Sequence, residues 1–156
     1  MKNNSIFRST LAAVSASLML ASCGQGDFLF ADKAVVKLSP VEGNPSVGYM
    51  DLHGGPEDTQ LVSVTADDVM RMEMHETVEE DGMSKMRPLK SVNIPAGETV
   101  KFEPGGKHLM IWGVGGGSIK QGYLTMTLIY ANDERIEMNA NIHKPGTNIN
   151  SRTVDE

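Results

Sequence analysis

Two histidines and two methionines have the residue types and the spacing of a site for a soft metal ion. In chain order they are His75, Met86, His108 and Met110, separated by ten, twenty-one and one residues. Thioethers are soft, neutral ligands, and together with imidazole they favour Cu(I) over hard cations such as Mg²⁺ or Ca²⁺. Zinc in proteins is typically bound by thiolate, imidazole or carboxylate groups instead. The four residues therefore predict a copper site, with Cu(I) as the main bound form.

The first two of these residues lie in a predicted β-hairpin. Residues 68–78 and 83–89 show the pattern of strands, and they flank a turn in which Gly82 can adopt positive φ. His75 and Met86 then lie opposite each other or within one register step on adjacent strands. Directly opposed residues have Cβ atoms about 5 Å apart, so the two side chains are close enough to share a ligand.

The other two residues lie on a separate predicted strand, 107–114. His108 and Met110 are two positions apart, so they share one face of that strand. Trp112 falls on the same face, where it either shields a metal ion from water or packs as an ordinary core residue. All four candidate ligands converge if the end of this strand approaches the hairpin.

The rest of the chain shows the same strand pattern, interrupted by turn residues. A length of 156 residues, 40% of them hydrophobic, suits one globular domain, and 16 glycines favour turns over long helices. Nine short strands in one small domain indicate an all-β antiparallel sandwich or barrel. The predicted strands are 33–39, 46–54, 59–66, 68–78, 83–89, 99–103, 107–114, 122–131 and 135–143.

Other sequence features that suggest chemistry have simpler interpretations. The glycine-rich stretch 113–120 lacks the ending of a phosphate-binding loop, and we predict a flexible connection there. The carboxylate pairs Asp67-Asp68 and Glu79-Glu80 fall in turn regions, where they are expected to be solvated. No serine, histidine and aspartate share a recognisable nucleophile context, so the sequence does not indicate an enzyme.

The beginning of the chain has the features of a lipoprotein signal peptide. Lys2 and Arg8 precede a short apolar run that ends in the letters LASC, which resemble a bacterial lipobox. Cys23 is the only cysteine, so no disulfide can form within the chain, and we expect lipid on its thiol. The alternative is an ordinary signal peptide cut near Ser22, which would leave a free thiol.

This interpretation divides the chain into four segments. They are a signal peptide at 1–22, a lipid-attached tether at 23–32, a copper-binding domain at 33–143 and a flexible tail at 144–156. Gly24 is not the aspartate that commonly marks retention in the inner membrane, which favours the outer membrane, facing the periplasm. Cleavage removes two of the 14 basic residues and leaves 12 against 20 acidic ones, a net charge of −8 that disfavours nucleic acid as a partner.

The spacing H-x10-M-x21-H-x-M resembles the copper motif of the periplasmic CuA chaperones (PCuAC). The flanking segments are similar to that family as well, in family order, at 48–54, 74–89, 94–113 and 124–130. The resemblance implies a cupredoxin-like Greek-key β-sandwich that binds one copper ion through His75, Met86, His108 and Met110. It also implies transport of copper to the CuA centre of cytochrome c oxidase, directly or through a partner thiol chaperone.

The sequence departs from the family pattern at three places. Ala34-Val35 stands where members often have Ala-Trp, and the tail lacks the methionines and histidines of a second copper site. The lipobox implies a tethered carrier. His143, Met74 and Met83 stay open as auxiliary ligands, although Met74 alternates with Met70 and Met72 on a face expected to be core.

Two other functional classes compete with a copper carrier. A blue-copper redox protein needs a cysteine thiolate, and Cys23 lies in the leader's cleavage motif, far from the domain. A structural or interaction lipoprotein would have no copper affinity and would tolerate changes at all four candidate ligands. The sequence leaves the copper recipient and the oligomeric state undetermined.

Overall fold

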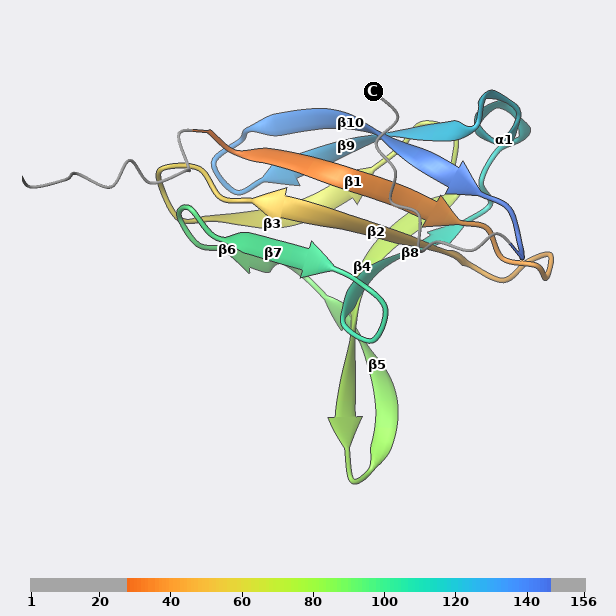
Figure 1. The fold of residues 1–156 in the computed structure, drawn as a ribbon, viewed down its shortest axis with the longest axis horizontal. Coiled ribbons are helices and arrows are strands. Elements are labelled where there is room, and N and C mark those ends of the chain that lie inside the picture. Colours follow the sequence, from red (N-terminus) through yellow and green to blue (C-terminus); the bar gives the residue numbers. More distant parts are fainter. Residues whose placement is uncertain (1–27, 147–156) are drawn as a thin grey trace, which may run out of the picture.

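The computed structural model describes residues 28–146 of the chain. The expected signal peptide, Cys23 and most of the predicted tail lie outside the described residues. The described part forms ten strands and one short helix (Figure 1). The strands are β1 Phe30–Lys37, β2 Ser46–His53, β3 Thr59–Thr65, β4 Arg71–Glu80, β5 Met83–Leu89, β6 Val92–Ile94, β7 Thr99–Phe102, β8 Lys107–Trp112, β9 Tyr123–Tyr130 and β10 Arg135–His143, and the helix is α1 Gly116–Gln121.

The strands form one folded sheet in the order β5-β4-β8-β7-β2-β1-β10-β9-β3-β6. Several neighbours are far apart in the chain, such as β4 with β8 and β1 with β10, which requires Greek-key crossovers. Two pairings, β1 with β10 and β7 with β8, are parallel, unlike the purely antiparallel arrangement expected from the sequence. Figure 1 shows that the β4–β5 hairpin projects beyond the body of the sandwich. The predicted all-β sandwich is therefore confirmed.

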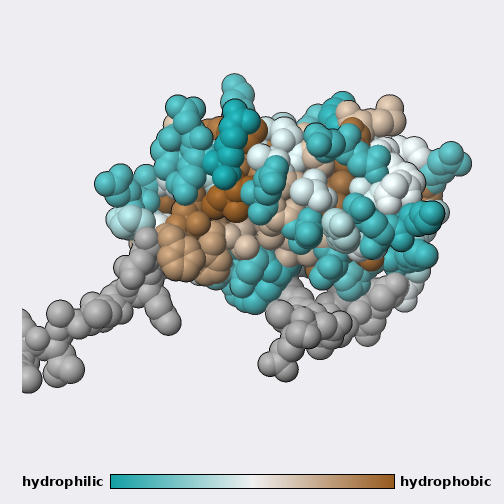
Figure 2. Space-filling model, turned by 90° about the horizontal axis from the view of Figure 1, so that it is seen from above, coloured by the Kyte–Doolittle hydropathy of each residue, from teal (hydrophilic) through white to brown (hydrophobic). Residues whose placement is uncertain are grey.

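The core lies between the inward faces of the sheet. Alternation along each strand directs apolar residues inward, and the contact between β3 and β4 brings the two parts of the sheet together. Figure 2 shows the side of β9 and β10, where hydrophilic side chains surround an apolar area at one end. The largest fully buried side chains are Tyr130, Phe102, Met50, Leu52, Leu61, Ile94, Leu109, Ile111, Leu124, Met126, Leu128 and Val36.

Two elements were absent from the sequence-based prediction. Residues 113–120 were expected to be a flexible connection, but most of them belong to helix α1 (Gly116–Gln121), which is capped by Gly122 with a φ of 89°. Strand β6 has three residues and pairs with β3 at the edge of the sheet. No helix within residues 28–146 is long and apolar enough to cross a membrane.

The loop before β4 is fixed to helix α1 by Asp68. Its Oδ2 atom accepts hydrogen bonds from the backbone N–H of Ser118 at 2.8 Å and from the Ser118 hydroxyl at 2.7 Å. Asp68 is partly exposed, but it was expected only to be solvated, and the hydrogen bonds to the buried Ser118 add a structural role. These hydrogen bonds lower the pKa of the Asp68 carboxyl from its ordinary value of 3.8. The ionised carboxylate therefore stabilises the folded state.

We expect Asp68→Asn to reduce stability at neutral pH more than in acid. A lowered pKa contributes stability above the unfolded-state value, and this contribution is lost as the pH falls through the folded-state value. The difference between wild type and Asp68→Asn should thus shrink below about pH 4, as measured by urea unfolding at pH 7 and pH 3. Asp67→Asn, an exposed neighbour with the same charge change, is the control. An unchanged difference across this pH range would contradict the assignment.

Candidate metal centre

The pairing of β4 with β8 places the two candidate histidines side by side. His75 and His108 are direct register partners, and their ring centroids are 6.1 Å apart with an angle of 35° between the ring planes. His108 is buried, and the side chain of His75 is 14% exposed. A metal–imidazole bond is about 2 Å long, so one ion between these rings can reach both.

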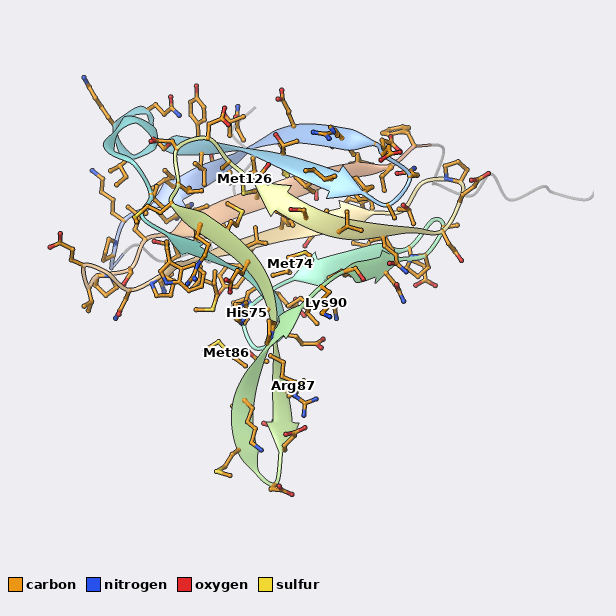
Figure 3. The ribbon with its side chains drawn as sticks, turned by 180° about the vertical axis from the view of Figure 1, so that it is seen from behind. Met74, His75, Met86, Arg87, Lys90 and Met126 are labelled. Carbon is orange, nitrogen blue, oxygen red and sulfur yellow. The ribbon has the colours of Figure 1, made fainter. Side chains whose placement is uncertain are left out.

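The two candidate methionines flank this histidine pair. Met110 is the register partner of Glu73, and Met86 on β5 is the partner of Thr77. Paired residues share a face, and alternate residues along β4 do too, so both methionines lie on the face of His75 and His108. His75 itself pairs with Pro88, so Met86 is displaced by two residues along the strand, one residue more than predicted, although it stays on the same face. Figure 3 shows His75 and Met86 projecting to the same side at the root of the hairpin.

The four candidate ligands therefore lie on one face of three neighbouring strands, with His108 and Met110 on β8, His75 on β4 and Met86 on β5. The third strand does approach the hairpin, because β8 pairs along the edge of β4 opposite β5. The thioether of Met86 is at the exposed end, since that residue is 60% exposed, whereas His108 is buried. This face therefore carries two imidazoles and two thioethers, and Met86 is the most exposed of the four residues.

Two charged side chains extend the same face of β4. Glu73 Oε2 lies 3.0 Å from His75 Nε2, and Glu73 Oε1 lies 3.4 Å from Arg71 Nε. The hydrogen bond from His75, together with the positive charge of Arg71, lowers the pKa of the Glu73 carboxyl. The Arg71 guanidinium stacks over the ring of Trp112 at 3.9 Å. The Trp112 ring thus contacts the guanidinium of Arg71 and does not pack as an ordinary core residue.

Neither Glu73 nor Arg71 was considered in the sequence-based prediction. Their positions in the sequence could have indicated them. Glu73 and Arg71 are two and four residues before His75, and alternate residues share one face of a strand. Among residues 28–146, no cluster of three or more His, Cys, Asp and Glu side chains could hold a metal ion. The possible site on this face therefore depends on the methionines.

The open auxiliary candidates lie away from the four residues. Met74 is 6% exposed and belongs to the core on the opposite face of β4. Met83 pairs with Glu80 near the hairpin turn and also lies on the opposite face. Met70, expected beside Met74 in the core, is 86% exposed because it precedes β4 in a bend.

His143 is three strands from the candidate centre. The register runs from Met110 to Val47, then to Lys37, then to His143. Neighbouring strands are about 4.8 Å apart, so this path spans about 14 Å. One ion cannot contact both Met110 and His143 in this arrangement.

Solved structures with a similar fold define the class of this domain. The copper-bound PCuAC domain from PmoF2 aligns with a TM-score of 0.59 and 17% identity, covering 75% of this chain and 93% of that chain. The solution structure of CuI-DR1885 from Deinococcus radiodurans aligns with a TM-score of 0.56 and 20% identity, covering 80% and 83%. The fold is thus the cupredoxin-like fold of PCuAC domains.

The family follows from the sequence. Residues 30–142 match the family model described as "Putative lipoprotein LpqE-like", and the chain belongs to this LpqE-like family. Together with the PCuAC fold, this match confirms the resemblance to PCuAC proteins seen in the sequence.

Two curated relatives share part of their length with the chain. "Putative lipoprotein Lxx21020" of Leifsonia xyli is 38% identical over 91 residues, covering 58% of this chain and 54% of that protein. "Uncharacterized protein RP573" of Rickettsia prowazekii is 26% identical over 113 residues, covering 65% and 62%. The chain thus spans between half and two thirds of the length of these relatives.

Proposed function

We propose that this protein is a copper metallochaperone that binds Cu(I) through His75, Met86, His108 and Met110. The observation that carries the proposal is the shared face of β4, β5 and β8, where the two imidazoles are paired and the two thioethers flank them. The neutral nitrogen and sulfur set suits Cu(I). The copper-bound PCuAC domain from PmoF2 and CuI-DR1885, which have a similar fold, support the same ion.

The geometry supports a carrier better than a redox centre. The chain's only cysteine is Cys23, so the domain has no thiolate for a blue-copper site. A carrier must release its ion, and the exposed Met86 offers a ligand that a recipient can displace from outside. We propose accordingly that the protein carries copper rather than catalysing a reaction, and that it hands the ion to the CuA centre of cytochrome c oxidase or to a partner thiol chaperone.

Titration of the chain from residue 24 onward with Cu(I), Cu(II) and Zn(II) tests this function. We expect one Cu(I) to bind per chain, more tightly than Zn(II). Residue 23 is omitted because a cysteine thiol would itself bind Cu(I). A chain that binds no Cu(I) would leave the alternative of a structural or interaction lipoprotein.

We further propose that Cys23 is lipidated and holds the domain at a membrane surface facing the periplasm, with the outer membrane favoured. The lipobox letters LASC and the lipoprotein family support this location. Lipid chains contribute about 0.8 kcal/mol per buried methylene, so a multiply acylated cysteine is firmly anchored.

Cys23→Ser should block lipid attachment and shift the protein from the membrane fraction to a precursor or to a product cut elsewhere. Copper affinity should survive, because the candidate ligands begin at His75. Mass spectrometry of the N-terminal peptide makes the measurement. An unmodified Cys23 in the native protein would replace the tethered carrier with a soluble one.

A further inference from the structure

Each candidate histidine has one ring nitrogen held by an oxygen acceptor. His75 Nε2 is 3.0 Å from Oε2 of Glu73, and His108 Nδ1 is 3.0 Å from the carbonyl oxygen of Gly106. A carboxylate and a carbonyl can only accept a hydrogen bond. The hydrogen must therefore be on Nε2 of His75 and on Nδ1 of His108.

The remaining ring nitrogens then carry the lone pairs. A neutral imidazole has one N–H donor and one unprotonated nitrogen, so these are Nδ1 of His75 and Nε2 of His108. Nδ1 of His75 is buried and has no hydrogen-bond partner within residues 28–146. An unpartnered buried acceptor costs free energy, which a bound metal ion would offset.

We propose that Glu73 is a positioning residue of the copper site, which holds His75 so that its Nδ1 atom binds Cu(I) while His108 binds through Nε2. This inference rests on the proposed function. Histidines that bind metals commonly donate their second ring N–H to a carboxylate or a backbone carbonyl. Here Glu73 is the carboxylate acceptor for His75, and the Gly106 carbonyl is the backbone acceptor for His108.

The carboxylate of Glu73 also has a second partner, on the side away from His75. Its second carboxylate oxygen pairs with Arg71, whose guanidinium lies over Trp112. Arg71 and Trp112 are register partners on β4 and β8, on the same face as the two histidines. The chain of contacts from Trp112 through Arg71 to Glu73 therefore restricts the rotation of the His75 ring before any ion arrives.

Nitrogen NMR of the histidine rings tests this assignment. The sample is the ¹⁵N-labelled chain from residue 23 onward, with Cys23→Ser to remove the competing thiol. Without copper, we expect His75 as the Nε2–H tautomer and His108 as the Nδ1–H tautomer. Addition of Cu(I) should shift the Nδ1 resonance of His75 and the Nε2 resonance of His108, and the hydrogens should stay on the other nitrogens.

Variants of Glu73 provide the second measurement. Glu73→Ala should mix the His75 tautomers and weaken Cu(I) binding about 10–100-fold, the usual cost of losing a group that orients a ligand. Glu73→Gln should retain most of the affinity, because an amide oxygen accepts the same hydrogen bond. Glu76→Gln is the matched control, since Glu76 lies on the opposite face of β4 and pairs with Lys107 at 2.8 Å.

The outcomes separate this inference from the proposed function. A copper-induced shift that is larger at Nε2 of His75 than at its Nδ1, or a Glu73→Ala variant that binds Cu(I) as tightly as wild type, would overturn the role of Glu73 alone. If Cu(I) changes neither histidine ring, the proposed function fails and the inference fails with it. The copper-free tautomers check the hydrogen bonds independently, and the dispersion of the same spectra shows whether each variant is folded.

Discussion

Met110→Ala is expected to weaken Cu(I) binding by at least about 100-fold, beyond the usual cost of losing an orienting group. The same change should weaken any Zn(II) binding far less, because a thioether contributes to Cu(I) as a soft ligand and zinc prefers other groups. Met110 lies on the face of the histidine pair, and β8 contains no other methionine that could replace its sulfur. Competition with a Cu(I)-specific chelator measures the affinity.

Met86 and Met83 make a matched pair for the same experiment. Both are on β5 and have nearly equal exposure, 60% and 59%, but they lie on opposite faces of the hairpin. Met86→Ala should reduce Cu(I) affinity as Met110→Ala does, and Met83→Ala should leave it unchanged. Equal losses for Cu(I) and Zn(II) would rule out selectivity for Cu(I), and full affinity in both Met86→Ala and Met110→Ala would rule out the site.

Leu109→Ala is expected to lower the free energy of unfolding by about 3–5 kcal/mol, the usual cost of a large cavity in a core. Leu109 is fully buried and pairs with Met74 on β4 and with Gly48 on β2. A side chain at Gly48 would approach Leu109 Cβ to 3.1 Å, so the packing leaves little room for neighbours to fill the cavity.

Urea unfolding of Leu109→Ala beside Val62→Ala makes the comparison. Val62 is 37% exposed on β3, and its truncation should change stability by less than about 1 kcal/mol. The result matters for the site because Leu109 joins β8 to the core between His108 and Met110. A loss below about 1 kcal/mol for Leu109→Ala would mean that β8 is not fixed by the core in this way.

The hairpin could be predicted from the sequence because its determinants are local. The strand predicted at 83–89 matches β5 from end to end, and Gly82 adopts the expected positive φ, 72°. The last strand, predicted at 135–143, also matches β10. Alternation and turn residues specify such elements without reference to the rest of the chain.

The partners of strands could not be predicted in the same way. Alternation shows that 107–112 is a strand, but the pairing of β8 with β4 depends on the topology of the whole sheet. From the sequence, His75 and His108 could be expected to meet only if the strand of His108 approached the hairpin. The structure shows that they are register partners. The position of His143 relative to Met110 likewise follows from three successive strand pairings.

Short elements and hydrogen-bond networks left too weak a pattern to be found. Helix α1 has six residues, two of them glycine, so it shows no helical period. Its stability comes from a distant residue, because Asp68 is fifty positions from Ser118 in the chain. The contact of Glu73 with His75 could have been predicted from the sequence, because the two residues are two positions apart and so share one face of a strand.

X-ray absorption at the copper edge of the Cu(I)-loaded chain tests the central claim most directly. The sample is the chain from residue 23 onward with Cys23→Ser, so that every sulfur bound to copper must come from methionine. We predict scattering from two imidazole nitrogens and two thioether sulfurs, with loss of one sulfur in Met86→Ala and in Met110→Ala. A copper ion surrounded only by oxygen and nitrogen, or an unchanged spectrum in both variants, would contradict the account.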